Sequence, residues 1–327
     1  MTTPRFGRAR CFAALLALTA TTWLGAHPAQ AAAVRVGNSS AQAFNFLPLV
    51  IGIQQKFFAA QDVEVTEIDF AGSAKLHQAM VAGAIDLGLG AGTDVAFLVK
   101  GAPEKAVGAI AITPALFGII VPYDSPAHTL ADLEGKRIGI STVGSLTQWL
   151  AFQLAKKEGW DPQSFTYVTD GSEYPSQLAA LETNAIDAQV SGAALGWNLE
   201  EQKKGRLLAP ASAFVGAFLQ NVVFASDDFI ARDPDVVRGF LKGWYQAVAF
   251  MAQHKAETMA IARERDHFSA AVEDKQYDTV MPSFSSDGRF PAEGVARVKS
   301  SFVELGILPE EPDMSKYLIE SFLPTPK

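Results

Sequence analysis

Segments with a strand-like pattern of apolar residues alternate along the chain with segments that have a helix-like pattern. Short runs rich in β-branched or small apolar residues predict buried strands, and segments with apolar residues three and four positions apart predict amphipathic helices. The predicted strands cover 34–37, 63–70, 85–90, 105–112, 116–121, 137–141, 165–169, 206–209 and 220–225. Helices are predicted between them at 48–60, 76–81, 95–100, 130–136 and 197–204, and from Gly144 onward. This alternation is typical of mixed β-sheets covered by helices.

The last third of the chain has a different pattern. From Asp233 onward the spacing predicts helices at 235–254, 256–265, 274–280, 292–305 and 315–322, with no strand between them. Because these helices lack the strand–helix rhythm, we expect them to pack against a lobe that earlier residues have built.

One segment of the chain occurs twice. Residues 70–92 and 170–194 share a Gly-Ser turn, a helix-period run and an Ala-Ile-Asp triplet that precedes a small-residue strand. A segment that occurs twice predicts two similar α/β lobes with the chemistry between them. The repeated carboxylates Asp86 and Asp187 are candidates for function, but their identical positions favour a turn or cap role.

Residues 1–31 predict a secretory signal peptide. Three arginines precede an apolar, Ala/Leu-rich run over 11–25, and Ala29-Gln30-Ala31 forms a small-x-small cleavage site. A retained membrane anchor is the less favoured interpretation, because the run is short for a span. We expect cleavage near Ala31 and export, with a bacterial periplasm as the simplest destination.

The charge and the cysteine content of the chain exclude several classes of chemistry and disfavour several classes of binding partner. The formal net charge is −8, and the leader holds three of the arginines and the only cysteine. The mature chain is therefore acidic and free of cysteine, which excludes disulfides and thiol chemistry and disfavours nucleic acid or anionic membranes as partners. No later apolar run is long enough to span a membrane.

Candidate catalytic chemistry is sparse. The histidines of the mature chain lack the spacing of a metal pair, and the one on the first repeated helix is predicted at the surface. They are His77, His128, His254 and His267. We therefore expect no catalytic residue, no metal site and no cofactor.

Small hydroxyl residues follow several predicted strands, at the turns into the next helices. In α/β sheets ligands bind at the carboxyl ends of the strands, and the free N–H groups of helix starts attract polar or negative groups. Each turn alone could be an ordinary N-cap, but five of them over two lobes predict a binding cleft. They are Ser39-Ser40, Gly72-Ser73, Gly92-Thr93, Thr142 with Gly144-Ser145, and Ser191-Gly192.

Several of these segments resemble a known family, the periplasmic substrate-binding proteins of ABC importers. The resemblance rests on the leader and on FLPLVIGIQQKFFAAQDVEV, GSAKLHQAMVAGAIDLGLG, LEGKRIGISTVGS and LAALETNAIDAQVSG. Within that family the chain is similar to the nitrate/sulfonate/taurine type, which shares its fold with thiamine-pyrimidine-precursor binding proteins.

The resemblance implies an α/β fold of the two-lobed periplasmic binding protein class (type II), with two mixed sheets flanked by helices and joined by a two-stranded hinge. Lobe I would comprise 32–121 and 225–327, including the helical C-terminal tail, and lobe II would comprise 122–224. The hinge strands would lie near 120–122 and 223–225, where the hydrophobic pattern also predicts crossings between lobes.

By the same resemblance, ligand contacts would come from the loop after the first strand, two helix starts of lobe I and the turns of lobe II. They are Ala41, Gln42, Phe44, Gly72, Ser73, Gly92, Thr93, Thr142, Gly144, Ser145, Leu146, Ser191 and Trp197. These stretches carry no arginine or lysine apart from Lys75. This disfavours nitrate-like ligands and favours an organic acid, a sulfonate or a neutral heterocycle with an apolar body.

We therefore expect a monomeric, exported solute-binding protein that captures a small organic ligand and delivers it to the membrane permease of an ABC importer, without catalysing a reaction. Two alternatives stay open. One is an enzyme similar to the pyrimidine synthase of thiamine biosynthesis, which the leader and the few histidines disfavour. The other is an exported ligand sensor that contacts a membrane kinase.

Overall fold

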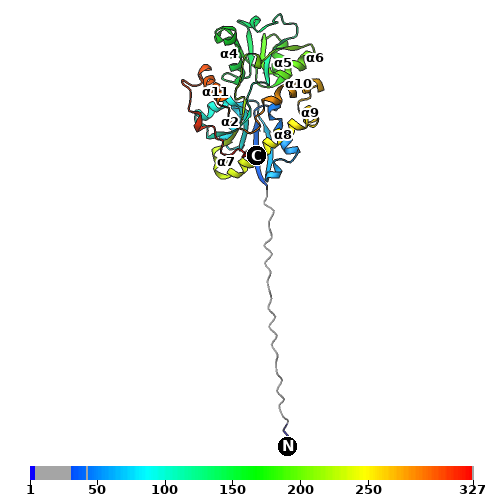
Figure 1. Ribbon diagram of the computed structural model, residues 1–327, viewed down its shortest axis with the longest axis vertical. Helices are drawn as coiled ribbons and strands as arrows, with labels where there is room; N and C mark the ends of the chain where they lie inside the picture. Colours follow the sequence, from blue (N-terminus) through cyan, green and yellow to red (C-terminus); the bar gives the residue numbers. More distant parts are fainter. Residues whose placement is uncertain (4–30, 42, 326–327) are drawn as a thin grey trace. The chain divides into compact units, whose positions relative to one another are not determined.

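The computed structural model describes residues 1–3, 31–41 and 43–325 (Figure 1). Most of the predicted leader therefore lies outside the described residues, as does Gln42. From Ala31 onward the chain builds two five-stranded mixed sheets with helices packed against them. None of the described helices is both long enough and apolar enough to cross a membrane.

The first sheet has the strand order β2-β1-β3-β10-β4. Its parallel part consists of β1 (Ala32–Asn38), β2 (Val63–Asp69) and β3 (Leu87–Ala91). The late strand β10 (Asn221–Ser226) lies antiparallel between β3 and β4 (Glu104–Ala111). The carboxyl ends of β1, β2 and β3 therefore meet at one edge of this sheet.

The second sheet repeats this arrangement in the order β7-β6-β8-β5-β9. Here β6 (Arg137–Ile140), β7 (Thr166–Thr169) and β8 (Ala188–Gly192) run parallel. The strand β5 (Phe117–Pro122) lies antiparallel between β8 and β9 (Gly205–Pro210). The predicted fold class, α/β with two mixed sheets flanked by helices, is confirmed.

Eleven α-helices complete the described part of the chain. Those that follow strands of the first sheet are α1 (Leu47–Gln54), α2 (Ser73–Val81) and α3 (Val95–Val99). Those of the second sheet are α4 (Leu146–Glu158), α5 (Tyr174–Glu182) and α6 (Ala193–Glu201). The C-terminal helices are α7 (Asp227–Arg232), α8 (Pro234–Gln253), α9 (Lys255–Asp266), α10 (Ala270–Val280) and α11 (Ala292–Glu304).

The two repeated segments end in the same ion-pair geometry. Asp86 accepts hydrogen bonds from the backbone N–H, Nε and Nη2 of Arg35 at 2.9, 3.0 and 2.8 Å. Asp187 accepts the equivalent three from Arg137 at the same distances. Each pair fixes the residue that precedes one parallel strand, β3 or β8, to the neighbouring parallel strand, β1 or β6. Both carboxylates therefore serve the scaffold, as their repeated position predicts.

Three predicted helices differ from the structure. The one predicted over 130–136 forms only a 3₁₀ turn at Leu130–Leu133. The helix predicted over 48–60 ends at Gln54, and Lys56 then adopts a positive φ of 59° that α-helical backbone does not allow. The segment 315–322 forms only a short 3₁₀ turn at Met314–Lys316. Ile319 then donates its N–H to the carbonyl of Ala106 at 2.9 Å, so this segment bonds to the edge of β4.

The chain crosses between the sheets earlier than the sequence predicts. The strand β5 pairs with β8 and β9 in the second sheet, and β10 pairs with β3 and β4 in the first. The chain passes from the first sheet to the second between β4 and β5, at 112–116, and returns between β9 and β10, at 211–220. The positions predicted for the hinge lie inside β5 and β10. The reason is that an apolar run predicts a buried strand but not the sheet that buries it.

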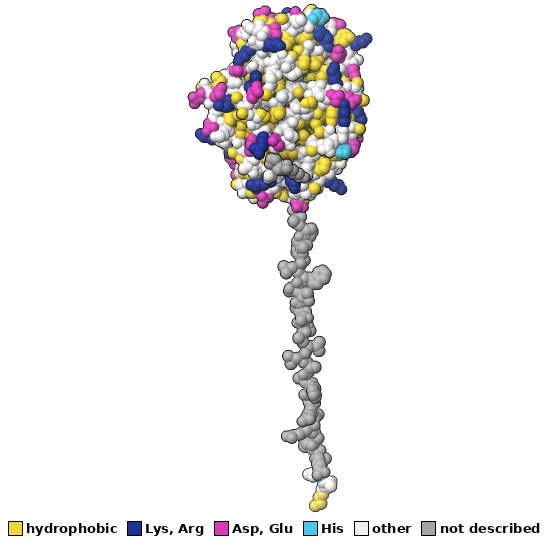
Figure 2. All heavy atoms as spheres, viewed as in Figure 1, with side chains coloured by type: hydrophobic (Ala, Val, Ile, Leu, Met, Phe, Trp, Pro, Cys, Tyr) yellow, Lys and Arg dark blue, Asp and Glu magenta, His cyan; other side chains and the backbone are white. Residues whose placement is uncertain are grey.

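The C-terminal helices contact both lobes (Figure 1). Glu304 of α11 accepts hydrogen bonds from Trp149 Nε1 and Gln153 Nε2 of α4, at 2.8 and 2.7 Å. At the other side, Phe268 stacks on Tyr174 with ring centroids 5.9 Å apart. On the face shown in Figure 2, acidic and basic side chains lie interspersed among apolar ones.

Candidate ligand-binding site

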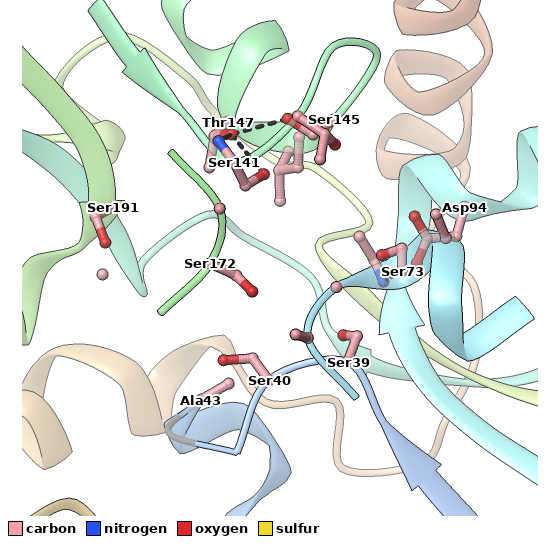
Figure 3. A pocket seen from close by; sticks show the side chains of 18 of the residues that line it. Ser39, Ser40, Ala43, Ser73, Asp94, Ser141, Ser145, Thr147, Ser172 and Ser191 are labelled. Carbon is pink, nitrogen blue, oxygen red and sulfur yellow. Dashed lines mark hydrogen bonds between the residues drawn. The ribbon is translucent and has the colours of Figure 1, made fainter. Parts of the chain in front are cut away.

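A cavity of about 340 Å³ lies where the carboxyl ends of the parallel strands of both sheets face each other (Figure 3). The first lobe lines it with the loop after β1, the start of α2 and the segment from Ala91 to Phe97. The second lobe lines it with the turn 141–147, with Gly171 and Ser172 after β7, and with the end of β8. This is the edge at which α/β sheets bind ligands.

The start of α4 forms one wall of this cavity. Thr147 Oγ1 accepts the backbone N–H of Ser141 at 2.9 Å and lies 2.8 Å from Ser145 Oγ. Ser145 caps the helix, since its Oγ accepts the N–H of Gln148 at 3.3 Å. The N–H groups of Leu146 and Thr147 find no acceptor in the described part of the chain, so they are free to bind a ligand.

The start of α2 forms the opposite wall. Its N-cap is Gly72, whose φ of 101° suits glycine, and no side chain of the described residues caps this helix. The preceding loop is held from two sides. Asn38 Oδ1 accepts the N–H of Ser40 at 3.0 Å, and Arg265 Nε of α9 donates to the carbonyl of Ala41.

The third wall belongs to the second sheet. Ser191 Oγ donates to Gln177 Oε1 at 2.6 Å, and Gln177 Nε2 donates to the carbonyl of Gly171 at 3.0 Å. Ser172 lies beside them, and its buried Oγ has no hydrogen-bond partner among the described residues. Figure 3 shows this hydroxyl directed into the cavity. An unpaired buried hydroxyl at this place is ready to bond to a ligand.

The one charged side chain among the described cavity-lining residues is Asp94. Its Oδ2 accepts the N–H of Ala91 at 2.8 Å and lies 3.6 Å from Nε2 of His77. The other ring nitrogen of His77, Nδ1, lies 2.7 Å from Oε2 of Glu104. Burial alone would lower the pKa of His77, but the two carboxylates outweigh it and raise this pKa to about 9.

The surface position predicted for His77 is wrong, because its side chain is only 2% exposed. The ring stacks on Phe97 at 4.7 Å and meets the edge of Phe224 at 4.8 Å. The spacing of three residues to the buried Met80 places His77 on the apolar face of α2, and that signal could have found it.

The structure brings some of the predicted contact residues to the cavity and places others elsewhere. Gly72, Ser73, Thr142, Gly144, Ser145, Leu146 and Ser191 line it. Phe44 is 1% exposed and packs in the core beside Phe284, whereas Trp197 packs under Lys275 with 4.8 Å from Nζ to the ring. As ligand contacts, all of these residues stay predictions.

Gly92 and Thr93 are buried behind the wall, and their neighbours Ala91 and Asp94 reach the cavity instead. A Cβ at Gly92 would lie 1.8 Å from the carbonyl oxygen of Leu219. The glycine therefore permits a close approach of backbones. Gln42 lies outside the described residues, and Ala41 contributes its carbonyl to Arg265.

The cavity combines hydroxyl groups with apolar side chains. Phe46, Phe97, Leu116 and Phe117 supply apolar surface. No group of three or more histidine, cysteine, aspartate or glutamate side chains in the described residues has an arrangement that could hold a metal ion. The site as built can enclose a small molecule with an apolar body and polar ends.

Residues 43–258 match the NMT1/THI5-like family. This chain belongs to that family. One relative of the NMT1/THI5-like chain is a 4-amino-5-hydroxymethyl-2-methylpyrimidine phosphate synthase of Schizosaccharomyces pombe. The two sequences are 22% identical over 279 residues, which cover 81% of this chain and 79% of that protein.

Two solved structures show the same fold. The alkanesulfonate-binding protein SsuA from Xanthomonas axonopodis pv. citri, bound to MOPS, matches with a TM-score of 0.75 and 21% identity over 90% of this chain and 100% of that chain. The periplasmic nitrate-binding protein NrtA from Synechocystis PCC 6803 matches with a TM-score of 0.69 and 15% identity over 89% and 86% of the two chains. This NMT1/THI5-like chain therefore has the periplasmic-binding-protein fold.

Proposed function

We propose that this protein is an exported solute-binding protein that captures a small organic ligand between its lobes and delivers it to the permease of an ABC importer. The observation that carries the proposal is a cavity to which both lobes contribute hydroxyl and backbone N–H groups. A ligand that contacts both walls binds the closed form more tightly than the open form, so binding shifts the population toward closure.

The ligand we propose has an apolar body and an acidic or polar end, such as a sulfonate, a carboxylate or a heterocycle. The free N–H groups at the starts of α2 and α4 suit an acceptor or an anionic group. The aromatic rings of Phe97 and Phe117 suit the body. The volume of about 340 Å³ suits a molecule of this size.

A second candidate function is that of a synthase, which the relative from Schizosaccharomyces pombe favours. Against it stands the chemistry of the cavity, whose described lining includes no histidine, cysteine or lysine. His77 lies behind Asp94 and packs between aromatic rings, out of reach of a ligand. We expect the purified protein to consume no cofactor when it is incubated with pyridoxal phosphate, thiamine precursors or nicotinamide nucleotides.

The test begins with the protein purified from the periplasm of an expressing bacterium. Native mass spectrometry of the protein as isolated reports any retained ligand. A panel of organic acids, sulfonates and heterocycles is then titrated, with the melting temperature and small-angle scattering as readouts. We expect at least one compound to raise the melting temperature and to make the particle more compact. If no compound of the panel does either, the proposal fails.

Two matched variants localise the binding. Ser172→Phe fills the cavity, whereas Ser125→Phe places the same ring in a different hollow at the amino ends of β6 and β8. We expect the first variant to lose binding and the second to keep it. Pull-down of a permease by the liganded protein supports delivery to an importer, and pull-down of a membrane kinase instead favours a sensor.

A further inference from the structure

We infer that Asp94 makes this site selective for ligands that carry an N–H donor, an amine or an amino-heterocycle, in addition to their acidic or polar end. The inference rests on the proposed function, because it concerns the ligand of the same cavity. It names a specificity-determining residue that the turns and hydroxyl groups of the sequence did not single out.

The first support is the geometry of the carboxylate. Oδ2 of Asp94 accepts the N–H of Ala91 and faces Nε2 of His77, so the protein occupies this oxygen. No donor among the described residues bonds to Oδ1. Figure 3 shows the carboxylate beside Ser73 at the cavity wall. One acceptor oxygen is therefore available to a ligand.

The second support is the charge of the group behind it. His77 and Glu104 are both almost fully buried, with side chains 2% and 0% exposed, and their nitrogen and oxygen lie 2.7 Å apart. The imidazolium of His77 and the carboxylate of Glu104 cancel each other's charge. The net negative charge of the three side chains is therefore that of Asp94, which borders the cavity.

Closure of the lobes removes water from this carboxylate. A buried carboxylate oxygen without a hydrogen-bond donor raises the free energy of the closed complex. A ligand N–H that donates to this oxygen removes that penalty, whereas a methyl group in the same place leaves it. An anionic ligand group is repelled from the Asp94 wall. It is therefore expected at the start of α4, whose lining residues 141–147 carry no charged side chain. The two walls thus orient a ligand with a donor at one end and an acceptor at the other.

The test uses pairs of compounds that differ only in an amino or a methyl group. The pairs are 4-aminobenzenesulfonate and 4-methylbenzenesulfonate, 4-aminobenzoate and 4-methylbenzoate, and 4-aminopyrimidine and 4-methylpyrimidine. Dissociation constants are measured by calorimetry on the mature protein. In every pair that binds, we expect the amino compound to bind about tenfold more tightly or better.

Asp94→Asn is expected to abolish this preference. The amide oxygen of the asparagine accepts the N–H of Ala91 in place of Oδ2, so the NH₂ group faces the ligand and offers it a donor instead of an acceptor. Asp235→Asn removes the same charge from a side chain that is 94% exposed, and we expect it to keep the preference. Equal binding of both members of each pair by the wild type overturns the inference, whether or not Asp94→Asn folds. So does a preference that survives in Asp94→Asn. If no compound of the wider panel binds the wild type, the proposed function fails as well.

Discussion

The buried imidazolium of His77 offers a sharp test of the physical chemistry behind the cavity wall. We consider His77→Leu, which keeps a similar volume and removes both ring nitrogens. In the wild type these nitrogens face Asp94 at 3.6 Å and Glu104 at 2.7 Å. The variant leaves two carboxylates together in a region where the Glu104 side chain has no exposed surface.

The expected magnitude follows from the burial of these groups. Removal of one partner of a buried ion pair costs about 3–5 kcal/mol, because the remaining charge loses its compensation. The pKa of His77 also makes the wild-type stability depend on pH. It is about 9 in the folded protein against 6.5 as the ordinary value, so the folded state holds a proton that the unfolded chain releases. The stabilisation is complete below pH 6.5, and about 3 kcal/mol of it is lost as the pH rises through 9.

The assay is equilibrium unfolding in urea at a series of pH values from 6 to 9.5, on the wild type and the variant. We expect the variant to be less stable by about 3–5 kcal/mol at pH 6–6.5. The difference should shrink by about 3 kcal/mol by pH 9.5. His254→Leu is the matched control, because that ring pairs with Glu257 at the surface and is 44% exposed. An exposed pair contributes at most about 1 kcal/mol.

One result would refute the reasoning. If wild type and His77→Leu lose stability in parallel between pH 6.5 and 9.5, His77 does not carry a proton in the folded state. The ring is then neutral and has a single N–H, which Nδ1 donates to Glu104, and the charge argument for Asp94 fails.

Three further substitutions test other parts of the structure. Ser145→Ala removes the cap of α4 and is expected to lower the unfolding free energy by about 0.5–2 kcal/mol and ligand affinity by about 1–2 kcal/mol; unchanged affinity with lower stability would make Ser145 a cap alone. Glu304→Ala leaves the buried indole N–H of Trp149 without its acceptor and should cost about 1–3 kcal/mol in urea unfolding, while Glu304→Gln, which keeps an oxygen there, should cost less. Gly92→Ala forces a Cβ against the carbonyl of Leu219 and should lower the melting temperature, with a cost of about 1–3 kcal/mol; an unchanged melting temperature would show that the backbone yields there.

Local periodicity predicted most of the scaffold. The strands of both sheets follow short apolar runs, and the repeated segments predicted two lobes of similar order. The equal Arg–Asp geometry at Asp86 and Asp187 explains why the repetition is visible in the sequence. Each aspartate must stand at the same distance before its strand in order to fix that strand to its neighbour.

The site was predictable only in part. The turns at Gly72-Ser73 and 142–146 line the cavity because a strand end followed by a helix start must lie at the carboxyl edge of a sheet. Aromatic residues near the same edges have no such constraint. Phe44 and Trp197 therefore pack in the interior, while Phe97 and Phe117 border the cavity.

The sequence by itself determined which faces of its strands and helices are apolar, since that depends on residues two, three or four positions apart. Only the tertiary structure decided which sheet receives β5 and β10, and which side chains stand behind Asp94. His77 and Glu104 are 27 residues apart, and Trp149 and Glu304 are 155 apart. Contacts over such separations arise when packed elements meet, and no local pattern of hydrophobic and polar residues specifies them.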